Sequence, residues 1–426
     1  MKLENPVFYL KYVLFALFII NVLAGCASKE QLTLMPTPVI YQDSTIDPFA
    51  HLASQHKSIK SQIFYATNRA PVDSSDTISY GNILDPVLHV GEATIRMGDP
   101  TTEWADLHKH SLSSEQITPV PLTLEKIDEF AVMPVKTERS HQNLTPELQS
   151  FVDSINSELA VAVDKEIVIY VHGTKVDFAN STILTAEVDH FAGRDFVGVA
   201  FAWPSHQNIF SYLVGTDVQR ALDSSASLHS LIFLLSEYTA AEHINILSYS
   251  AGGRVASKAM FELYHSFAGL DDTVLKEKFR LGAVVFAAAD VEVDIFFERL
   301  GPISKLAEQV VITVTDDDNA LKAAQLYMGG NVRTGTIDAE IIEEAFLLSN
   351  DIKNFEIIDV SAGKEERGFD IVGHHYWYRH PWMSSDIIFL MRTDLPPSRR
   401  GLSLSTLQSN KILNHRLLQK TDLQNA

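Results

Sequence analysis

The 426-residue sequence has very little cysteine, and its one thiol is Cys26. A single cysteine cannot form an intramolecular disulfide, and it cannot supply the thiolates of a cysteine-based zinc cluster. Positive charge is also scarce, since 34 Lys and Arg stand against 54 Asp and Glu and give a formal net charge of −20. Binding to a nucleic-acid backbone needs a basic surface that displaces counterions, so we expect no nucleic-acid partner.

Hydrophobic residues, by contrast, are plentiful. They make up 46% of the chain, and charged residues make up 21%, which is typical of a packed globular protein and not of a disordered one. A chain of this length can form two or three domains or one elaborate α/β domain. The glycine patterns of P-loops and of dinucleotide-binding turns are absent from the sequence, which argues against both kinds of nucleotide chemistry.

The N-terminus has the layout of a secretory signal. Lys2 and Lys11 precede an apolar stretch over 12–24, which is shorter than the roughly 20 residues that a membrane span needs. The stretch ends in the motif LAGC, which resembles the lipobox of bacterial lipoproteins and closes at Cys26. The resemblance implies removal of residues 1–25, acylation of Cys26, and a place in the bacterial cell envelope, with the periplasmic face of the outer membrane as one destination. An uncleaved anchor helix with a chance cysteine is the alternative.

Composition divides the rest of the chain into four stretches. Residues 26–60 are polar and contain three prolines, which predicts a lipidated tether. Residues 61–145 form a β-rich N-terminal extension, in which 97–120 has the composition of a loop or insertion. Residues 146–395 alternate predicted strands with predicted helices and form the candidate catalytic domain. Residues 396–426 hold five Lys or Arg against one Asp, which predicts a solvated or membrane-facing tail.

Six short apolar runs in the candidate catalytic domain predict the central strands of a sheet. Strands that are buried on both faces read as nearly continuous apolar runs, as they do in parallel sheets. An apolar stripe from Val218 to Leu235 predicts one amphipathic helix between the second and third runs. The alternation predicts an α/β fold with a doubly wound, mostly parallel sheet. The six runs are 166–171, 196–201, 244–247, 281–288, 309–315 and 355–360.

The third run leads directly into a turn of small residues, and a helical pattern follows. A strand, a sharp turn and a helix are the context of the G-x-S-x-G nucleophile turn, in which Ser250 would be the nucleophile. The N-terminus of the following helix favours the negative charge that develops in the reaction. Ser248 stands where the first glycine of the pattern is expected. An ordinary turn rich in serine and glycine is therefore the alternative.

The first predicted strand of this domain ends in His172-Gly173, which resembles the His-Gly that follows an early strand in α/β-hydrolases. The backbone N–H groups of Thr174 and Ala251 would then form an oxyanion hole. For His172 itself we expect a structural role in the turn and no part in acid–base chemistry.

Seven segments, taken in order, resemble landmarks of a family of bacterial esterase/lipase-like α/β-hydrolases of unknown function (DUF900). The resemblance extends over roughly residues 62–392. It implies the α/β-hydrolase fold and a Ser–acid–His triad, and it says little about the substrate. The segments are FYATNR at 64–69, HG at 172–173, FAWPS at 201–205, SYSAG at 248–252, FAAAD at 286–290, DNAL at 318–321 and GHHY at 373–376.

Hydrolases of this fold place the triad in the chain order serine, acid, histidine. Asp318 lies just beyond the predicted strand 309–315, where the acid usually lies, and Asp290, after the preceding strand, is the alternative acid. The resemblance selects His374 as the general base, because it follows the glycine of the family's segment. The spacing of a helical histidine zinc site is absent there, so we expect no metal and no cofactor.

Together these features predict a membrane-anchored serine hydrolase. Its substrate would be an acyl ester of a small molecule or a lipid, cleaved through an acyl-enzyme intermediate, and amide hydrolysis would use the same residues. The alternative is a catalytically silent lipoprotein that uses the hydrolase fold as a binding or envelope-scaffold module. Ser248, in place of glycine, favours that alternative.

Overall fold

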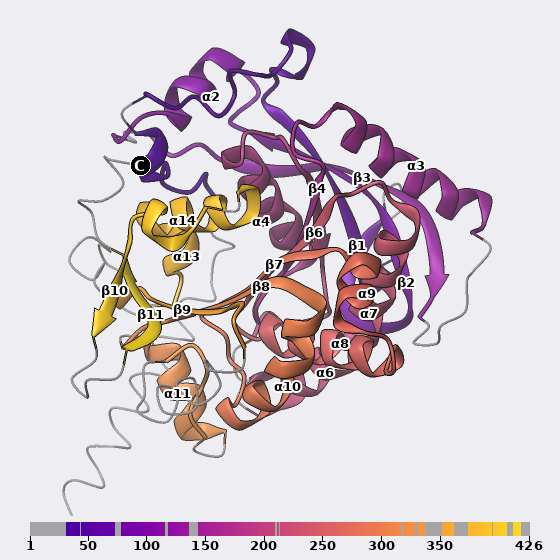
Figure 1. The fold of residues 1–426 in the computed structure, drawn as a ribbon. Helices are drawn as coiled ribbons and strands as arrows, with labels where there is room; N and C mark the ends of the chain where they lie inside the picture. The colour runs from indigo at the N-terminus through magenta and orange to yellow at the C-terminus, as the bar shows by residue number, and fades with distance from the viewer. Residues whose placement is uncertain are drawn as a thin grey trace, which may run out of the picture.

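One sheet runs through the whole molecule, with helices packed against both of its faces (Figure 1). The structure is a computed structural model. It describes residues 31–42, 44–72, 78–115, 118–135, 144–208, 211–212, 214–316, 318–328, 331–336, 352–361, 374–393, 395–406 and 412–418.

Within these residues the sheet has eleven strands in the order β10-β11-β9-β8-β7-β6-β4-β5-β1-β2-β3. The strands from β11 to β1 in this order are parallel, while β2, β3 and β10 are antiparallel to their neighbours. The predicted α/β class with a mostly parallel sheet is confirmed. The strands are β1 (Lys60–Val72), β2 (Ser79–Met97), β3 (Leu122–Pro134), β4 (Glu166–Val171), β5 (Val197–Phe201), β6 (His243–Tyr249), β7 (Leu281–Ala287), β8 (Ala307–Val314), β9 (Phe355–Asp359), β10 (Leu402–Thr406) and β11 (Ile412–Leu418).

Alternate residues of the central strands pack into two different cores. Ile167 and Ile169 of β4 point to a core shared with α3, α7, α8, α9 and α10, whereas Val168 and Tyr170 point to a core shared with α4 and α14. Figure 1 shows these two helical layers on either side of the strands. Burial on both faces explains why these strands are almost wholly apolar. The helices are α2 (Trp104–Ser111), α3 (Pro146–Val161), α4 (Phe178–Phe191), α6 (Thr216–Asp223), α7 (Ser225–Tyr238), α8 (Gly252–Ser266), α9 (Asp272–Phe279), α10 (Val293–Leu306), α11 (Asn319–Tyr327), α13 (Tyr376–Arg379) and α14 (Pro381–Arg392).

The β-rich N-terminal extension is continuous with the catalytic sheet. Residues 64–66 of β1 pair in parallel with residues 199–201 of β5, and β2 and β3 then extend the sheet outward. The predicted loop over 97–120 contains the two-turn helix α2, which begins with a capping box between Glu103 and Asp106. Such a box satisfies two free N–H groups at the start of the helix.

The stretch expected to be a tether differs from the prediction. Leu34, Met35, Tyr41 and Phe49 are buried, and the N–H of Met35 donates to Glu187 Oε1 on α4 at 2.6 Å. A few separated apolar side chains are enough to hold such a segment on the domain, because each one that is buried contributes about 1.5–3 kcal/mol. Residues 31–60 therefore include a packed arm, with the short 3₁₀ helices η1 (Val39–Tyr41) and η2 (Ser54–His56).

Two other expectations need correction. The single helix expected from Val218 to Leu235 is two helices, α6 and α7, that meet at Ser224, whose hydroxyl donates to the carbonyl of Arg220. The tail from 396 onward was expected to be a solvated extension. Instead Arg400 is buried and bonds to Asp386 and Glu356, and β10 and β11 extend the sheet beyond β9. A charged residue can be buried in this way when it is paired.

The N-terminal signal and Cys26 lie outside the described residues, so cleavage and lipidation stay predictions. Among the helices that the structure describes, none combines the length and the apolar character needed to cross a bilayer.

Candidate active site

The turn between β6 and α8 has the strained backbone expected of a nucleophile turn. Ser250 has a φ of 52°, in the left-handed region that side chains other than glycine rarely adopt. Its N–H donates to the carbonyl of Ala287, and its own carbonyl accepts from the N–H of Asp290. A Cβ on Gly252 would lie 2.3 Å from the carbonyl oxygen of Val171, so this position requires glycine. The turn therefore sets the serine hydroxyl at the start of α8.

Ser248, the departure from the glycine pattern, fits its place on β6. It is fully buried, and its hydroxyl donates to the carbonyl of Val285 on β7 at 3.0 Å. The extra polar atom is thus satisfied within the sheet, which removes the cost of burying it. The turn at Ser250 forms without a glycine at 248.

Three of the residues singled out in the sequence form a hydrogen-bonded chain. The Oγ of Ser250 lies 2.8 Å from Nε2 of His374, and Nδ1 of the same ring lies 2.5 Å from Oδ2 of Asp318. This geometry fits a serine hydroxyl that donates to Nε2 while Nδ1–H donates to the carboxylate. The His374 side chain is 10% exposed and that of Asp318 is 0% exposed. The imidazole of His374 thus lies between the hydroxyl of Ser250 and the carboxylate of Asp318.

Asp318 is fixed by the helix that it begins. It is the N-cap of α11, and its Oδ1 accepts from the N–H of Leu321 at 2.9 Å. One carboxylate oxygen thus caps the helix and the other faces His374. Tyr249 holds the histidine from the other side, because its hydroxyl donates to the carbonyl of His374 and its ring centroid lies 5.1 Å from the imidazole.

The alternative acid, Asp290, belongs to a different cluster. It is buried, and its oxygens lie 3.1 Å from Nε of Arg333 and 3.5 Å from Nε of Arg254. Burial raises the pKa of Asp290 to about 7, against the opposing charge of Arg333. Arg333 also donates to the carbonyls of Ala324 and Met328 at the end of α11. The cluster thereby braces the helix whose first turn carries Asp318, and the imidazole of His374 is held by Asp318.

The expected oxyanion donors lie on the two sides of Ser250. A Cβ on Gly173 would come within 3.0 Å of the Cβ of Ser250, so the backbone leading to Thr174 passes directly beside the nucleophile. Ala251 follows Ser250 at the start of α8. Within the described residues, neither the N–H of Thr174 nor that of Ala251 donates to a backbone carbonyl. Both remain available to an oxygen of a reacting carbonyl.

His172 has the structural place expected of it. Its ring stacks on Trp203 at 5.2 Å, and its Nδ1–H donates to the carbonyl of Gly173 at 2.7 Å. Burial, reinforced by the charge of Arg69, lowers the pKa of His172 to about 3. Arg69 also donates to the carbonyls of Val176 and Ala202. The FYATNR segment thus fastens the loop after β4 to the loop after β5.

The sequence reasoning missed a second aspartate–histidine pair beside this loop. Asp217, on α6, accepts from the hydroxyl of Thr174 at 2.9 Å and from both the N–H and the Nδ1 of His206, the ring contact being 2.5 Å. The His206 side chain is 24% exposed and that of Asp217 is 0% exposed. His206 directly follows the FAWPS segment, but no spacing rule joins it to an aspartate eleven positions later.

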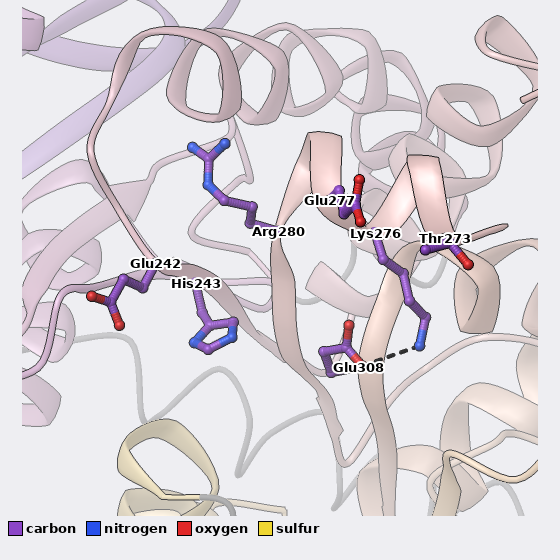
Figure 2. Close-up of a pocket in the computed structure, with 7 residues that line it drawn as sticks. All are labelled: Glu242, His243, Thr273, Lys276, Glu277, Arg280 and Glu308. Atoms are coloured by element: carbon purple, nitrogen blue, oxygen red, sulfur yellow. Dashed lines mark hydrogen bonds and ion pairs between the residues drawn. The ribbon is translucent and has the colours of Figure 1, made fainter. Parts of the chain in front are cut away.

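A separate pocket lies at the opposite edge of the sheet (Figure 2). Its volume is about 300 Å³, and it is found where β6, β7 and β8 begin. The candidate active site is where β6 and β8 end. An ion pair of 3.2 Å joins Lys276 to Glu308 across this pocket. Its lining consists of Glu242, His243, Thr273, Lys276, Glu277, Arg280 and Glu308, so it contains no residue of the candidate active site.

A family model described as an α/β-hydrolase of unknown function (DUF900) matches residues 148–391 of the chain. Among solved structures, esterase B from Lactobacillus rhamnosis is 13% identical, with a TM-score of 0.31, and the match covers 52% of this chain and 71% of that one. A lipase-esterase related protein from Clostridium acetobutylicum is 10% identical, with a TM-score of 0.25, and the match covers 54% of this chain and 95% of that one. No curated protein matches the sequence.

Proposed function

The chain belongs to the α/β-hydrolase family of unknown function, DUF900, and from that premise we propose that it is a serine hydrolase that cleaves carboxylic esters. The observation that carries the proposal is the hydrogen-bonded chain from Ser250 through His374 to Asp318. It joins a strained serine turn to a base and an orienting acid, which is the arrangement that activates a serine hydroxyl.

In the proposed reaction, Ser250 Oγ attacks the carbonyl carbon of the ester while Nε2 of His374 takes the hydroxyl proton. The tetrahedral oxyanion accepts hydrogen bonds from the N–H groups of Thr174 and Ala251. His374 then gives its proton to the departing alkoxide, which leaves as the alcohol. A water molecule attacks the acyl-enzyme with the same base, and the carboxylic acid leaves while Ser250 regains its proton.

The buried environment supports each of these steps. Asp318 stabilises the imidazolium that forms on His374, and the low dielectric around a fully buried carboxylate strengthens that interaction. The four-turn helix α8 begins at Gly252 and directs its N-terminal N–H groups toward the oxyanion. The glycine at 252 is what allows this close approach of helix and strand.

The alternative is a catalytically silent scaffold, which Ser248 in place of glycine favoured in the sequence. Ser248 is accommodated by its hydrogen bond to Val285, and the serine turn keeps its strained backbone. Labelling with a fluorophosphonate probe separates the two functions. The wild-type protein should be labelled and Ser250→Ala should not. The matched control is Ser248→Ala, at the end of β6 just before the turn, which should keep the label.

Two results would overturn the proposal. Labelling that persists in Ser250→Ala would remove Ser250 from the reaction. Absence of both labelling and turnover of short-chain esters in the folded wild-type protein would favour a binding or scaffold role. If labelling is specific, a series of 4-nitrophenyl esters of increasing acyl length defines the substrate class.

We also propose that the protein is a lipoprotein of the bacterial cell envelope, on the strength of the LAGC motif that closes at Cys26. Mass spectrometry of the N-terminal peptide from a lipoprotein-processing bacterium tests this. The expected peptide begins at Cys26 and carries acyl chains, and Cys26→Ser should remain uncleaved. An unmodified Cys26 within an uncleaved N-terminus would contradict the proposal.

A further inference from the structure

The pair of His206 and Asp217 is built as a rigid polar site. Asp217 is fully buried, and it accepts hydrogen bonds from the Thr174 hydroxyl, the His206 N–H and His206 Nδ1. With Nδ1 committed to the carboxylate, the other ring nitrogen, Nε2, is the free end of the imidazole. Nε2 has no hydrogen-bond partner among the residues that the structure describes. The side chain is 24% exposed, so this nitrogen can reach a ligand.

This pair lies beside the reacting centre, on the side away from His374. The strands run in the order β8-β7-β6-β4-β5, and all are parallel, so their carboxyl ends share one edge. Ser250 follows β6 and Asp318 follows β8. Thr174 follows β4 and His206 follows β5, on the opposite flank of Ser250. The bond from Asp217 to Thr174 joins His206 to the loop that passes the nucleophile.

Two cations lie near His206 in a strongly acidic protein. Lys175, next to Thr174, is exposed, and Arg220 donates to the carbonyl of Pro204, two residues before His206. The two nearby carboxylates are already hydrogen-bonded: Asp217 holds His206, and Asp177 caps α4 by accepting from the N–H of Asn180. The exposed Lys175 and the outer nitrogen of His206 are therefore the groups that an anion would meet at this point.

We propose that His206, oriented by Asp217, binds an anionic oxygen of the substrate, so that the preferred substrates are esters that also carry a carboxylate or phosphate group. The inference rests on the proposed esterase function and names its substrate class. When both ring nitrogens carry protons, Nδ1–H donates to the buried carboxylate and Nε2–H makes a charge-assisted hydrogen bond to the anion. The same carboxylate also accepts a hydrogen bond from the Thr174 hydroxyl. Asp217 thus positions both His206 and the residue whose N–H is the proposed oxyanion donor.

Matched pairs of neutral and anionic esters test the substrate class. The pairs are 4-nitrophenyl hexanoate with mono-4-nitrophenyl adipate, and 4-nitrophenyl octanoate with mono-4-nitrophenyl suberate, which differ only in a terminal carboxylate. The measured quantity is the ratio of kcat/KM for the anionic ester to that for the neutral one. In His206→Ala this ratio should fall about tenfold, mostly through KM of the anionic ester. His206→Gln keeps a neutral donor and should restore part of it.

The matched control is His108→Ala. His108 also pairs with an aspartate, Asp47, at 3.0 Å and is 32% exposed, but it lies on α2 near the far end of α4. In His108→Ala the ratio of kcat/KM for the anionic ester to that for the neutral ester should match the wild-type ratio. A ratio in His206→Ala that stays within twofold of the wild-type ratio for both pairs would overturn the proposal, as would an equal fall in the His108 variant.

A binding measurement separates this proposal from the proposed catalysis. In Ser250→Ala, mono-4-nitrophenyl adipate should shift the ring nitrogens of His206 in ¹H–¹⁵N spectra, and 4-nitrophenyl hexanoate should not. This result would support the anion site even if the fluorophosphonate test removed Ser250 from catalysis. An unshifted His206 ring at saturating anionic ester would overturn the site even if Ser250 proved to be the nucleophile.

Discussion

Two aspartate–histidine pairs flank the nucleophile strand, and they differ in what the outer ring nitrogen meets. In both, a fully buried carboxylate lies 2.5 Å from Nδ1. In the pair of Asp318 and His374 the side chain of the histidine is 10% exposed, and Nε2 lies 2.8 Å from Ser250 Oγ. In the pair of Asp217 and His206 the side chain of the histidine is 24% exposed, and Nε2 has no hydrogen-bond partner among the residues that the structure describes. The same two residue types thus fit the base that we propose in one place and the anion contact that we propose in the other.

The carboxylates also differ in their second partner. The other oxygen of Asp318 accepts from the N–H of Leu321 in the first turn of α11, so this carboxylate is held by a helix. Asp217 bonds to Thr174, so it is anchored to the loop that passes Ser250. We therefore expect the third group in each chain to decide the role of the histidine, and the experiments below separate the two pairs by removing one part at a time.

The largest difference between the pairs is expected from deleting each imidazole. In His374→Ala, kcat for 4-nitrophenyl esters should fall by about a million-fold, because Ser250 loses the group that takes its proton. The loss in His206→Ala should be at least about a hundredfold smaller, since that ring takes no proton from the nucleophile. Initial rates at saturating ester measure both. Comparable losses in the two variants would show that the pairs do not have separate roles.

A smaller effect should follow from neutralising the acid without removing it. Asp318→Asn keeps a residue that caps helices well, so α11 and the melting temperature should change little. The amide cannot hold the same tautomer of His374, and kcat should fall by about 10,000-fold. The comparison variant is Asp290→Asn, with rates corrected for the active fraction by fluorophosphonate titration. If kcat falls more in Asp290→Asn than in Asp318→Asn, the acid role passes to Asp290.

The smallest effect concerns Glu187, a buried carboxylate that accepts a hydrogen bond from a backbone N–H. Burial raises the pKa of Glu187 to about 8 from the usual 4.5, and its recorded partner is the N–H of Met35. Between these values the native state keeps the proton while the unfolded state loses it, so rising pH weakens the native state through this group. Glu187→Gln removes that dependence. Its melting temperature relative to the wild type should rise from about pH 5 to about pH 9.

Differential scanning calorimetry over this range measures the effect. The matched control is Glu115→Gln, at an exposed acid whose own bonds are local, which should leave the difference flat across the same range. A difference for Glu187→Gln that stays constant with pH would show that the raised pKa does not contribute to folding stability.

The central sheet could be predicted because strands that are buried on both faces have nearly continuous apolar sequences. Runs such as 281–288 have no polar residue that would need a partner, and the structure has β7 there. Ser250 and Asp318 could be placed in advance because each closely follows a strand, and parallel strands bring their carboxyl ends together, whereas His374 was selected by the resemblance of its segment to that of the family. Their roles in catalysis stay predictions until the variants are measured.

The missed features depend on contacts between distant segments. Leu34 and Met35 are two apolar residues within a polar stretch, and only the folded surface of α4 and its surroundings makes them part of a core. His206 and Asp217 lie in different elements, and their pairing requires the turn between β5 and α6. Arg333 is likewise buried against Asp290, which follows β7, and against the carbonyl of Ala324 on α11. Neither periodicity nor motif spacing encodes such contacts.

The packed arm has a geometric consequence for a lipid-anchored form of the protein. From Cys26 to Leu34 the chain can span at most about 28 Å, and a domain of this size is about 50 Å across. Met35 is fastened to the second half of α4, a helix that begins at the loop beside Ser250 and runs away from it. A lipid at Cys26 would hold the bilayer near that end. The candidate active site, at the other end of α4, would then lie away from the bilayer, and we would expect its substrates to arrive from solution.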